Sequence, residues 1–178
     1  YSMDSLRNHR GYASLGAVYE VNDRHSIGAE GFYQISTTRN RTNSTSTFTN
    51  GSSIENSSQY SGYEKRNVWS ASANYIAKLD TLGSTFKLIG DFYSQINSDN
   101  DDYSNRALSA GIATDSTYRS IVGTDYRIYS LSAALEKNFN AKTSLHVGAK
   151  YTRHEMNNDL LYEYLSGGEW HVHDGQTR

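Results

Sequence analysis

Residues 69–96, WSASANYIAKLDTLGSTFKLIGDFYSQI, consist of two alternating segments on either side of a short turn at 80–83. Before the turn every second residue is apolar or aromatic, and the residues between are mostly polar. After the turn the alternation resumes with Phe86, Leu88, Gly90 and Phe92. A period of two residues is that of a β-strand with one apolar face, so this stretch predicts an antiparallel hairpin.

The same hairpin pattern occurs three times along the chain. The short turns begin at Asn22, Asp80 and Asn138, each 58 residues after the one before. Strands of roughly 11 to 15 residues leave each turn in both directions, longer than the five or six usual in soluble sheets. Three long segments, at about 37–63, 98–125 and 155–178, follow the hairpins, and we expect them to be loops. The first holds 17 Ser, Thr or Asn among its 27 residues, a composition unable to build a core.

The expected fold class is all-β, an antiparallel up-and-down meander of about six long strands in one unit over residues 1–178. Short turns at one end, long loops at the other and long alternating strands are typical of a transmembrane β-barrel. Six strands are too few to close, since known single-chain barrels begin at about eight. Bare sheet edges are not tolerated in lipid. We therefore expect a segment of a larger barrel, completed by other strands of a longer chain or by copies of this one.

Composition agrees better with a barrel than with an ordinary soluble domain. Hydrophobic residues make up 36% of the chain and the mean hydropathy is −0.73. The chain holds 15 Tyr and no Pro, a residue that cannot donate to a strand ladder. A net charge of −2 gives no electrostatic case for nucleic acid, and the absence of Cys excludes disulfides and thiolate metal sites. Nothing resembles a signal peptide and the first residue is Tyr1, so we interpret the chain as a piece of a longer precursor.

Two interpretations of the apolar face compete: it packs against a second sheet in a soluble sandwich, or it contacts lipid. The aromatic residues favour lipid, because they form two groups, a far belt about 10 to 12 residues from the turn centres and a near belt about 4 to 7 residues away. At about 3.3 Å per residue and a tilt near 45°, ten residues rise about 23 Å, close to an outer-membrane apolar band. The expected membrane-interface residues are Tyr33, Trp69, Phe92, Tyr129 and Tyr151 in the far belt, and Tyr19, Tyr75 and Phe86 in the near belt.

Three phrases carry a resemblance to a known family: GAVYEVNDRHSIGAEGFYQ at 16–34, SASANYIAKLDTLGSTFKLIGDFYSQINS at 70–98 and YSLSAALEKNFNAKTSLHVGAKYTRHEMNN at 129–158. They resemble the C-terminal barrel of the Bacteroidetes TonB-dependent-receptor-like outer membrane protein beta-barrel family. The most characteristic part, 74–94, joins an Asn-Tyr strand, a D-x-x-G turn and an Asp-Phe strand. The resemblance implies a parent protein with a carboxypeptidase-regulatory-like domain and a plug before a barrel of about 22 strands. It also implies import of a bulky nutrient with energy passed by TonB.

No motif indicates catalysis, because G-x-S-x-G, the P-loop and G-x-G-x-x-G are all absent, and we expect no enzyme. Two groups of potential metal ligands fall in the expected loops: Glu169, His171, His173 and Asp174 for a transition metal, and Asp99, Asp101 and Asp102 for Ca²⁺. The acidic group lacks the glycine and distal Glu of an EF-hand. We interpret both groups as solvated loop residues and predict no metal and no cofactor.

The polar face of the expected strands carries six charged residues that would line a lumen: Glu30, Arg66, Lys87, Asp91, Glu136 and Lys150. Such residues either solvate the wall or tune selectivity. Five aromatic residues fall in or beside the expected loops: Phe48, Tyr60, Tyr63, Tyr103 and Tyr118. They either contact a ligand or hold the loops together, and both alternatives stay open.

Two hypotheses for function follow. In the first, the chain is a wall segment of a TonB-dependent transporter-like outer-membrane barrel, with its loops outside and its short turns in the periplasm, and its parent imports a bulky nutrient or siderophore-type ligand. Its partners would be outer-membrane lipid, the remaining barrel strands and plug of the parent or homo-oligomer copies, and TonB through the parent. In the second, the chain is a non-transporting β-sheet interaction module that self-associates or binds a partner through its long polar loops.

Overall fold

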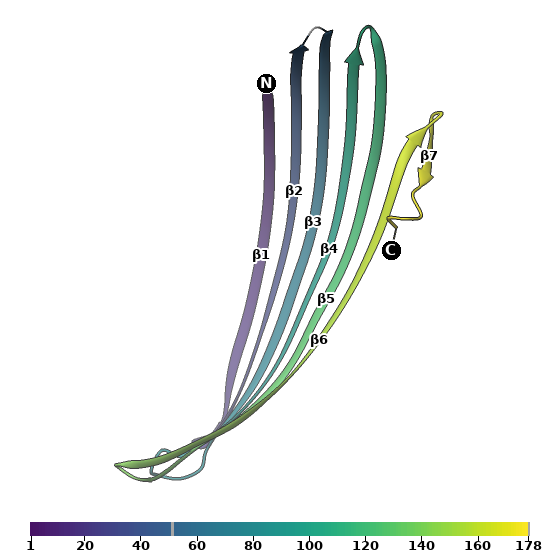
Figure 1. Cartoon of the computed structure of the whole chain (residues 1–178). Coiled ribbons are helices and arrows are strands. Elements are labelled where there is room, and N and C mark those ends of the chain that lie inside the picture. The colour runs from purple at the N-terminus through teal and green to yellow at the C-terminus, as the bar shows by residue number, and fades with distance from the viewer. Residues whose placement is uncertain (51, 178) are drawn as a thin grey trace.

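The computed structural model describes residues 1–50 and 52–177. Seven strands form one antiparallel sheet in chain order, each paired with the next (Figure 1). Their bounds are β1 (Ser2–Asn22), β2 (His25–Asn50), β3 (Ser52–Lys78), β4 (Thr85–Ser109), β5 (Ile112–Asn140), β6 (Thr143–Ser166) and β7 (Glu169–Val172). The predicted all-β antiparallel meander is confirmed, with the short β7 in addition to the six expected strands.

The three segments expected to be loops are mostly strand, and this part of the prediction was wrong. Residues 37–63 contribute to β2 and β3, residues 98–125 to β4 and β5, and the last segment holds the end of β6 and all of β7. Gly51 and Arg178, which fall in the first and last segments, lie outside the described residues. The error came from equating a polar composition with disorder. In an extended hairpin the neighbouring strand pairs the backbone N–H and C=O groups, so Ser-, Thr- and Asn-rich sequence continues the ladder without a core.

The strands are much longer than one membrane crossing needs. Apart from β7 they contain 21 to 29 residues. At about 3.3 Å per residue and a tilt near 40°, a strand of such length rises about 50 to 75 Å, against an apolar band of about 25 Å. Figure 1 shows these strands curving together as one sheet from the end that holds the turns at 23–24, 79–84 and 141–142, here called the turn end, to the opposite far end.

The register places the alternating apolar positions of all six long strands on one face. One row of paired residues crosses the sheet as Tyr19, Ile27, Tyr75, Leu88, Ala133 and Ala149. Because side chains alternate between faces, a slip of one residue in any strand would move its apolar side chains to the opposite face. This surface is called the apolar face below, and the opposite one the polar face.

Neither face is covered by a second layer in the part of the chain that the structure describes. Its buried hydrophobic residues are Val68 and Ala77, whereas Tyr19 and Tyr151 are 69% and 67% exposed. The two-layer sandwich is therefore not the fold of these residues. Residues 1–50 and 52–177 include no helix with the length and apolar character needed to cross a membrane. The outer edge of β1 and most of the outer edge of β6 have no partner strand among the described residues.

Candidate functional site

The eight residues expected at the membrane interface all lie on the apolar face. In the far belt, Tyr33 pairs with Trp69 in one row, and Phe92 pairs with Tyr129 in the next row toward the turn end. Tyr151 pairs with Leu131, one row nearer the turns again. Ring centroids are 4.3 Å apart for Trp69 and Phe92, and 5.0 Å apart for Phe92 and Tyr129. The far belt is thus a diagonal chain of aromatic side chains across the strands.

The slope of this diagonal measures the strand tilt. From β2 or β3 to β6 the far belt descends two rows, which is four residues, or about 13 Å at about 3.3 Å per residue. The sideways distance from β3 or β2 to β6 is three or four interstrand steps of about 4.8 Å, or about 14 to 19 Å. If the belt lies level in the membrane, this ratio of descent to sideways distance means that the strands are tilted by about 35 to 43° from the membrane normal. This tilt is that of a transmembrane barrel, about 35 to 45°. The near belt descends in the same direction, from Tyr19 and Tyr75 in one row to Phe86 in the next.

Small and aliphatic residues separate the two belts. On β1 to β5 the row between them contains Ala17, Ala29, Ala73, Gly90 and Leu131, and on β6 the same row ends at Tyr151 of the far belt. Leu131 in this row is 53% exposed. An exposed surface this apolar and this extended is what a lipid-facing wall requires. The assignment of the individual aromatic residues to the membrane interface stays a prediction.

The polar face carries all six of the charged residues that were expected to line a lumen: Glu30, Arg66, Lys87, Asp91, Glu136 and Lys150. Asp91 of β4 accepts hydrogen bonds from Ser72 Oγ of β3 and Ser130 Oγ of β5, both at 2.8 Å. This bridge across three strands satisfies the carboxylate on a face that is otherwise exposed. Hydrogen bonds between neighbouring strands thus hold this charged side chain in place on the polar face.

The second short turn is fixed by the carboxylate of Asp80. It accepts hydrogen bonds from the backbone N–H groups of Leu82 and Ser84 at 3.0 Å, and from Lys137 Nζ on β5 at 2.6 Å. The hydrogen bonds from Lys137 and then Ser84 hold the pKa of Asp80 well below its usual range. Gly83 has a φ of +84°, a conformation that disfavours residues with a Cβ. The D-x-x-G pattern therefore forms a turn in which the Asp carboxylate binds the turn backbone and Lys137 of the next hairpin, and the Gly adopts the positive φ.

A row of aromatic side chains crosses the polar face near the far end. Tyr60, Tyr103 and Tyr118 come from β3, β4 and β5, with successive centroids 5.0 and 4.8 Å apart. Tyr162 of β6 continues the row at 5.7 Å from Tyr118, and His173, just after β7, lies 6.0 Å from Tyr162. These five side chains are called the aromatic row.

Sequence reasoning found only part of the aromatic row. It named Tyr60, Tyr103 and Tyr118, but also Tyr63, which lies on the apolar face, and Phe48, which lies nearer the tip of β2. It did not identify Tyr162 as a member of the aromatic row. The apolar alternation ends near His154, but β6 continues to Ser166, and counting in steps of two from Lys150 places Tyr162 on the polar face.

Tyr60 reaches across Gly62 to donate a hydrogen bond to Asp101 Oδ1 at 2.8 Å. A Cβ on Gly62 would lie 2.3 Å from the Tyr60 hydroxyl, so this contact depends on the glycine. Burial, and then the bond to Asp101, raise the pKa of Tyr60 to about 12. Beside it, a groove of about 470 Å³ is lined by residues that include Glu64, Arg66 and Asp99. Rings and carboxylates together form a surface that can stack against a flat ligand and accept hydrogen bonds from its hydroxyl groups.

The two groups of potential metal ligands are not assembled as metal sites in the described residues. No group of three or more His, Asp or Glu side chains there is close enough to hold an ion. Asp99 and Asp101 lie on the polar face of β4, whereas Asp102 lies on the apolar face. His171 stacks on Tyr164 at 5.5 Å, and His173 belongs to the aromatic row.

The fold and its two faces define the wall of a transmembrane β-barrel. Residues 77–178, more than half of the chain, match the model of the outer membrane protein beta-barrel family. The chain belongs to this family, and its location is the bacterial outer membrane. No curated protein matches the sequence.

Among solved structures, a mutant of the ferric enterobactin receptor PfeA from Pseudomonas aeruginosa is similar, with 9% identity, 92% of this chain and 41% of that chain covered, and a TM-score of 0.20. The ferric-catecholate import receptor Fiu from E. coli K12 is similar with 10% identity, 90% and 43% coverage, and a TM-score of 0.18. The KdgM porin is similar with 9% identity, 85% and 98% coverage, and a TM-score of 0.14. The chain spans about two fifths of the length of the two receptors. These low TM-scores do not establish a closer relationship.

Proposed function

We propose that this chain is a wall segment of a TonB-dependent transporter-like barrel, whose complete protein imports a bulky nutrient or siderophore-type ligand. The observation that carries the proposal is the two-faced sheet: an exposed apolar face with two tilted aromatic belts, and a polar face with ordered charges. A channel wall needs both faces, since one contacts lipid and the other contacts water. Remaining barrel strands, a plug and TonB are the partners that this role requires.

The aromatic row is the proposed ligand contact. It lies on the polar face, where the barrel lumen would be, and Tyr60 is nine residues beyond Trp69 on β3, outside the far belt. With the short turns in the periplasm, this end of the sheet faces the cell exterior. A ligand whose flat rings carry hydroxyl groups fits both the tyrosine faces and the neighbouring carboxylates. We propose no catalytic activity for this segment.

Spin labels on the complete outer-membrane protein that carries this chain test the assignment of the two faces. The chain contains no Cys, so Ala71→Cys on the apolar face and Ser70→Cys on the polar face each add one labelling site to it. In lipid vesicles, the label at 71 should collide mainly with oxygen, which dissolves in hydrocarbon, and the label at 70 with a water-soluble nickel chelate. Equal accessibility of the two labels to the nickel chelate would refute the lipid-facing wall.

Among the described residues, the outer edge of β1 and most of the outer edge of β6 lack a partner strand, which favours a second candidate, a self-associating sheet without transport. A substitution in the aromatic row distinguishes the two functions. Tyr103→Ala should impair uptake of the ligand in a transporter while leaving assembly intact. In a purely associating module, the substitution should leave nutrient uptake by cells unchanged.

A further inference from the structure

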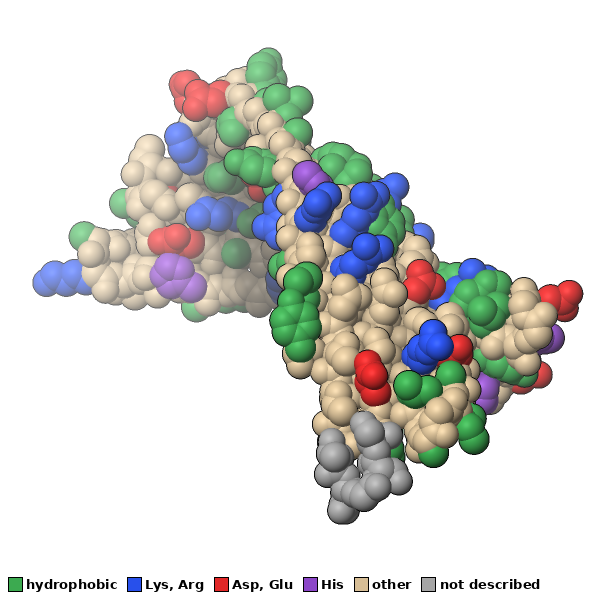
Figure 2. Space-filling model, turned by 90° about the horizontal axis from the view of Figure 1, so that it is seen from above, with side chains coloured by type: hydrophobic (Ala, Val, Ile, Leu, Met, Phe, Trp, Pro, Cys, Tyr) green, Lys and Arg blue, Asp and Glu red, His purple; other side chains and the backbone are tan. Residues whose placement is uncertain are grey.

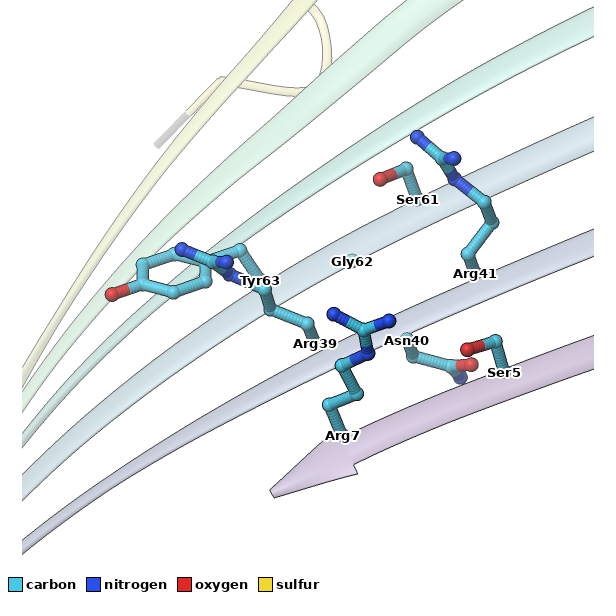
Figure 3. Close-up of a pocket in the computed structure, with 8 residues that line it drawn as sticks. All are labelled: Ser5, Arg7, Arg39, Asn40, Arg41, Ser61, Gly62 and Tyr63. Atoms are coloured by element: carbon cyan, nitrogen blue, oxygen red, sulfur yellow. The ribbon is translucent and has the colours of Figure 1, made fainter. Parts of the chain in front are cut away.

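Three arginines form a cluster on the apolar face, beyond the far belt. Arg7 of β1 and Arg39 of β2 are direct partners in one row, and Arg41 lies in the next row away from the turn end. They line a groove of about 480 Å³ that also includes Ser61 and Tyr63. Figure 3 shows the three guanidinium groups arranged around the position of Gly62, with Arg39 beside the ring of Tyr63. The Arg39 Cζ lies 5.4 Å from the Tyr63 ring centroid.

Among the residues that the structure describes, this cluster lacks the acidic partners that the other arginines of the same face possess. Arg127 pairs with Asp125, Arg153 pairs with Glu155 at 2.6 Å, and Arg119 pairs with Glu163 at 2.5 Å. Among the described residues no carboxylate lies within 4 Å of Arg7, Arg39 or Arg41. Figure 2 shows a group of Lys and Arg side chains near the centre of the view, with others scattered over the surface.

The direct pairing of Arg7 with Arg39 is unfavourable by itself. Like charges placed opposite each other on neighbouring strands repel. Lys65, two residues from Tyr63 on the same face of β3, adds a further positive charge nearby. An anion seated between the guanidinium groups removes this repulsion, and a phosphate accepts paired hydrogen bonds from such forks.

The height of the cluster selects the kind of anion. Ile35, 37% exposed, is the outermost apolar residue of the apolar face on β2, and Arg39 is four residues beyond it. Four residues at about 3.3 Å and a tilt near 40° rise about 10 Å. The headgroup layer of a bilayer is only about 5 to 8 Å thick on each side. A charged headgroup that extends beyond the ordinary phospholipid layer is therefore the better match.

We propose that Arg7, Arg39 and Arg41 bind the phosphorylated sugar headgroup of a glycolipid in the outer leaflet. The acyl chains of the same molecule would lie against the alanine- and glycine-rich band between the belts. The tyrosine ring of Tyr63 orients the Arg39 guanidinium and offers its face to a sugar ring. This inference rests on the proposed function, because it requires the apolar face to contact the membrane.

The test compares two triple variants of the complete outer-membrane protein in non-ionic detergent. In the first, the three cluster arginines are replaced by Gln. In the control, Arg10 on the polar face and Arg24 and Lys142 at the turn end, all exposed, are replaced by Gln. Both variants lose the same charge. Binding is measured with purified lipopolysaccharide, its dephosphorylated form, phosphatidylglycerol and inorganic phosphate.

Each exposed arginine–phosphate contact should change the affinity about two- to fivefold, so the cluster variant should bind lipopolysaccharide about ten- to a hundredfold more weakly. The control and the original protein should bind it equally, and dephosphorylation should weaken binding to the original protein as much as the cluster variant does. Unchanged affinity of the cluster variant, or an equal loss in the control, would overturn the inference. Equally tight binding of phosphatidylglycerol or inorganic phosphate would overturn the choice of a glycolipid.

The spin-label measurement separates this inference from the proposed function. If the label at Ala71→Cys reports hydrocarbon and the cluster variant still binds lipopolysaccharide normally, only the glycolipid site is wrong. If that label reports water, the apolar face does not contact lipid, and the proposed function fails together with the site.

Discussion

Replacing Ala73 by Arg should destabilise the assembled barrel far more than the same change on the polar face. Ala73 lies four residues from Trp69 toward the turn end, or about 10 Å below the far belt at about 3.3 Å per residue and a tilt near 40°. Tyr75 of the near belt lies two residues, or about 5 Å, on the other side, so Ala73 lies between the two belts and within the apolar band. Its row neighbours, Ala29 and Gly90, leave room for a larger side chain, so steric overpacking adds little.

The expected cost follows from the depth of the charge. An arginine on the lipid face costs about 2 to 4 kcal/mol at the bilayer midplane and about 0 to 1 kcal/mol near an interface, so between the belts we expect about 1 to 3 kcal/mol, a factor of about 5 to 160 in the folding equilibrium. The matched control is Ser70→Arg, three residues away on the polar face between Phe32 and Tyr93. A solvent-facing change there should alter stability by no more than about 0.5 kcal/mol.

Folding of the complete outer-membrane protein into lipid vesicles provides the assay. The urea midpoint and slope give the free energy of unfolding for the original protein and for each variant. The difference between Ala73→Arg and Ser70→Arg is the quantity of interest, because expression and refolding conditions are common to both. If the two variants are equally stable, or if Ser70→Arg is the more damaging, the assignment of the faces is wrong.

Three further predictions concern single contacts. Asp80→Asn should lower stability at neutral pH but not in strong acid, because the folded pKa of Asp80 is depressed and its stabilisation, present above the unfolded value of 3.8, is lost as the pH falls. A difference in urea midpoint that stays constant at all pH values would contradict this. The phenol of Tyr60 should titrate near pH 12, and the stabilisation from its contact with Asp101 should be lost as the pH rises above 10 toward that value. Asp101→Asn should lower the pKa of Tyr60, and ultraviolet absorbance in which all tyrosines titrate near 10 would disprove the contact. Arg119→Met should destabilise the far end of β6 by about 1 to 2 kcal/mol and speed amide exchange there, because the carboxylate of Glu163, whose side chain is 11% exposed, loses its partner. Unchanged exchange would show that the pair is not stabilising.

The periodicity of the strands near the turns was sufficient to predict the fold and the division into two faces. Within β3 and β4, the residues assigned to the apolar or polar face of the hairpin around Asp80 lie where the alternation placed them. This success has a simple cause, because successive side chains of any strand must point to opposite faces. The same rule, applied further along β6, would also have located Tyr162.

The extent of the strands was not predictable from composition. The Ser-, Thr- and Asn-rich sequence of 37–63 has few apolar residues, yet β2 and β3 are paired there through Asn50 and Ser52. Its order comes from hydrogen bonds to a neighbouring strand, a property of the pairing rather than of the segment. Composition tests whether a segment can bury itself, and these segments do not need burial.

The sequence by itself determined the alternation, the three turns and the aromatic spacing, because each depends on residues close together along the chain. Only the tertiary structure decided which side chains from different strands meet. It placed Arg7 opposite Arg39, and Tyr60 beside Tyr103, although 32 and 43 residues separate these pairs. The physical reason is register: hydrogen bonding between strands fixes which positions face each other, and a shift by two residues would keep every face unchanged while replacing every neighbour.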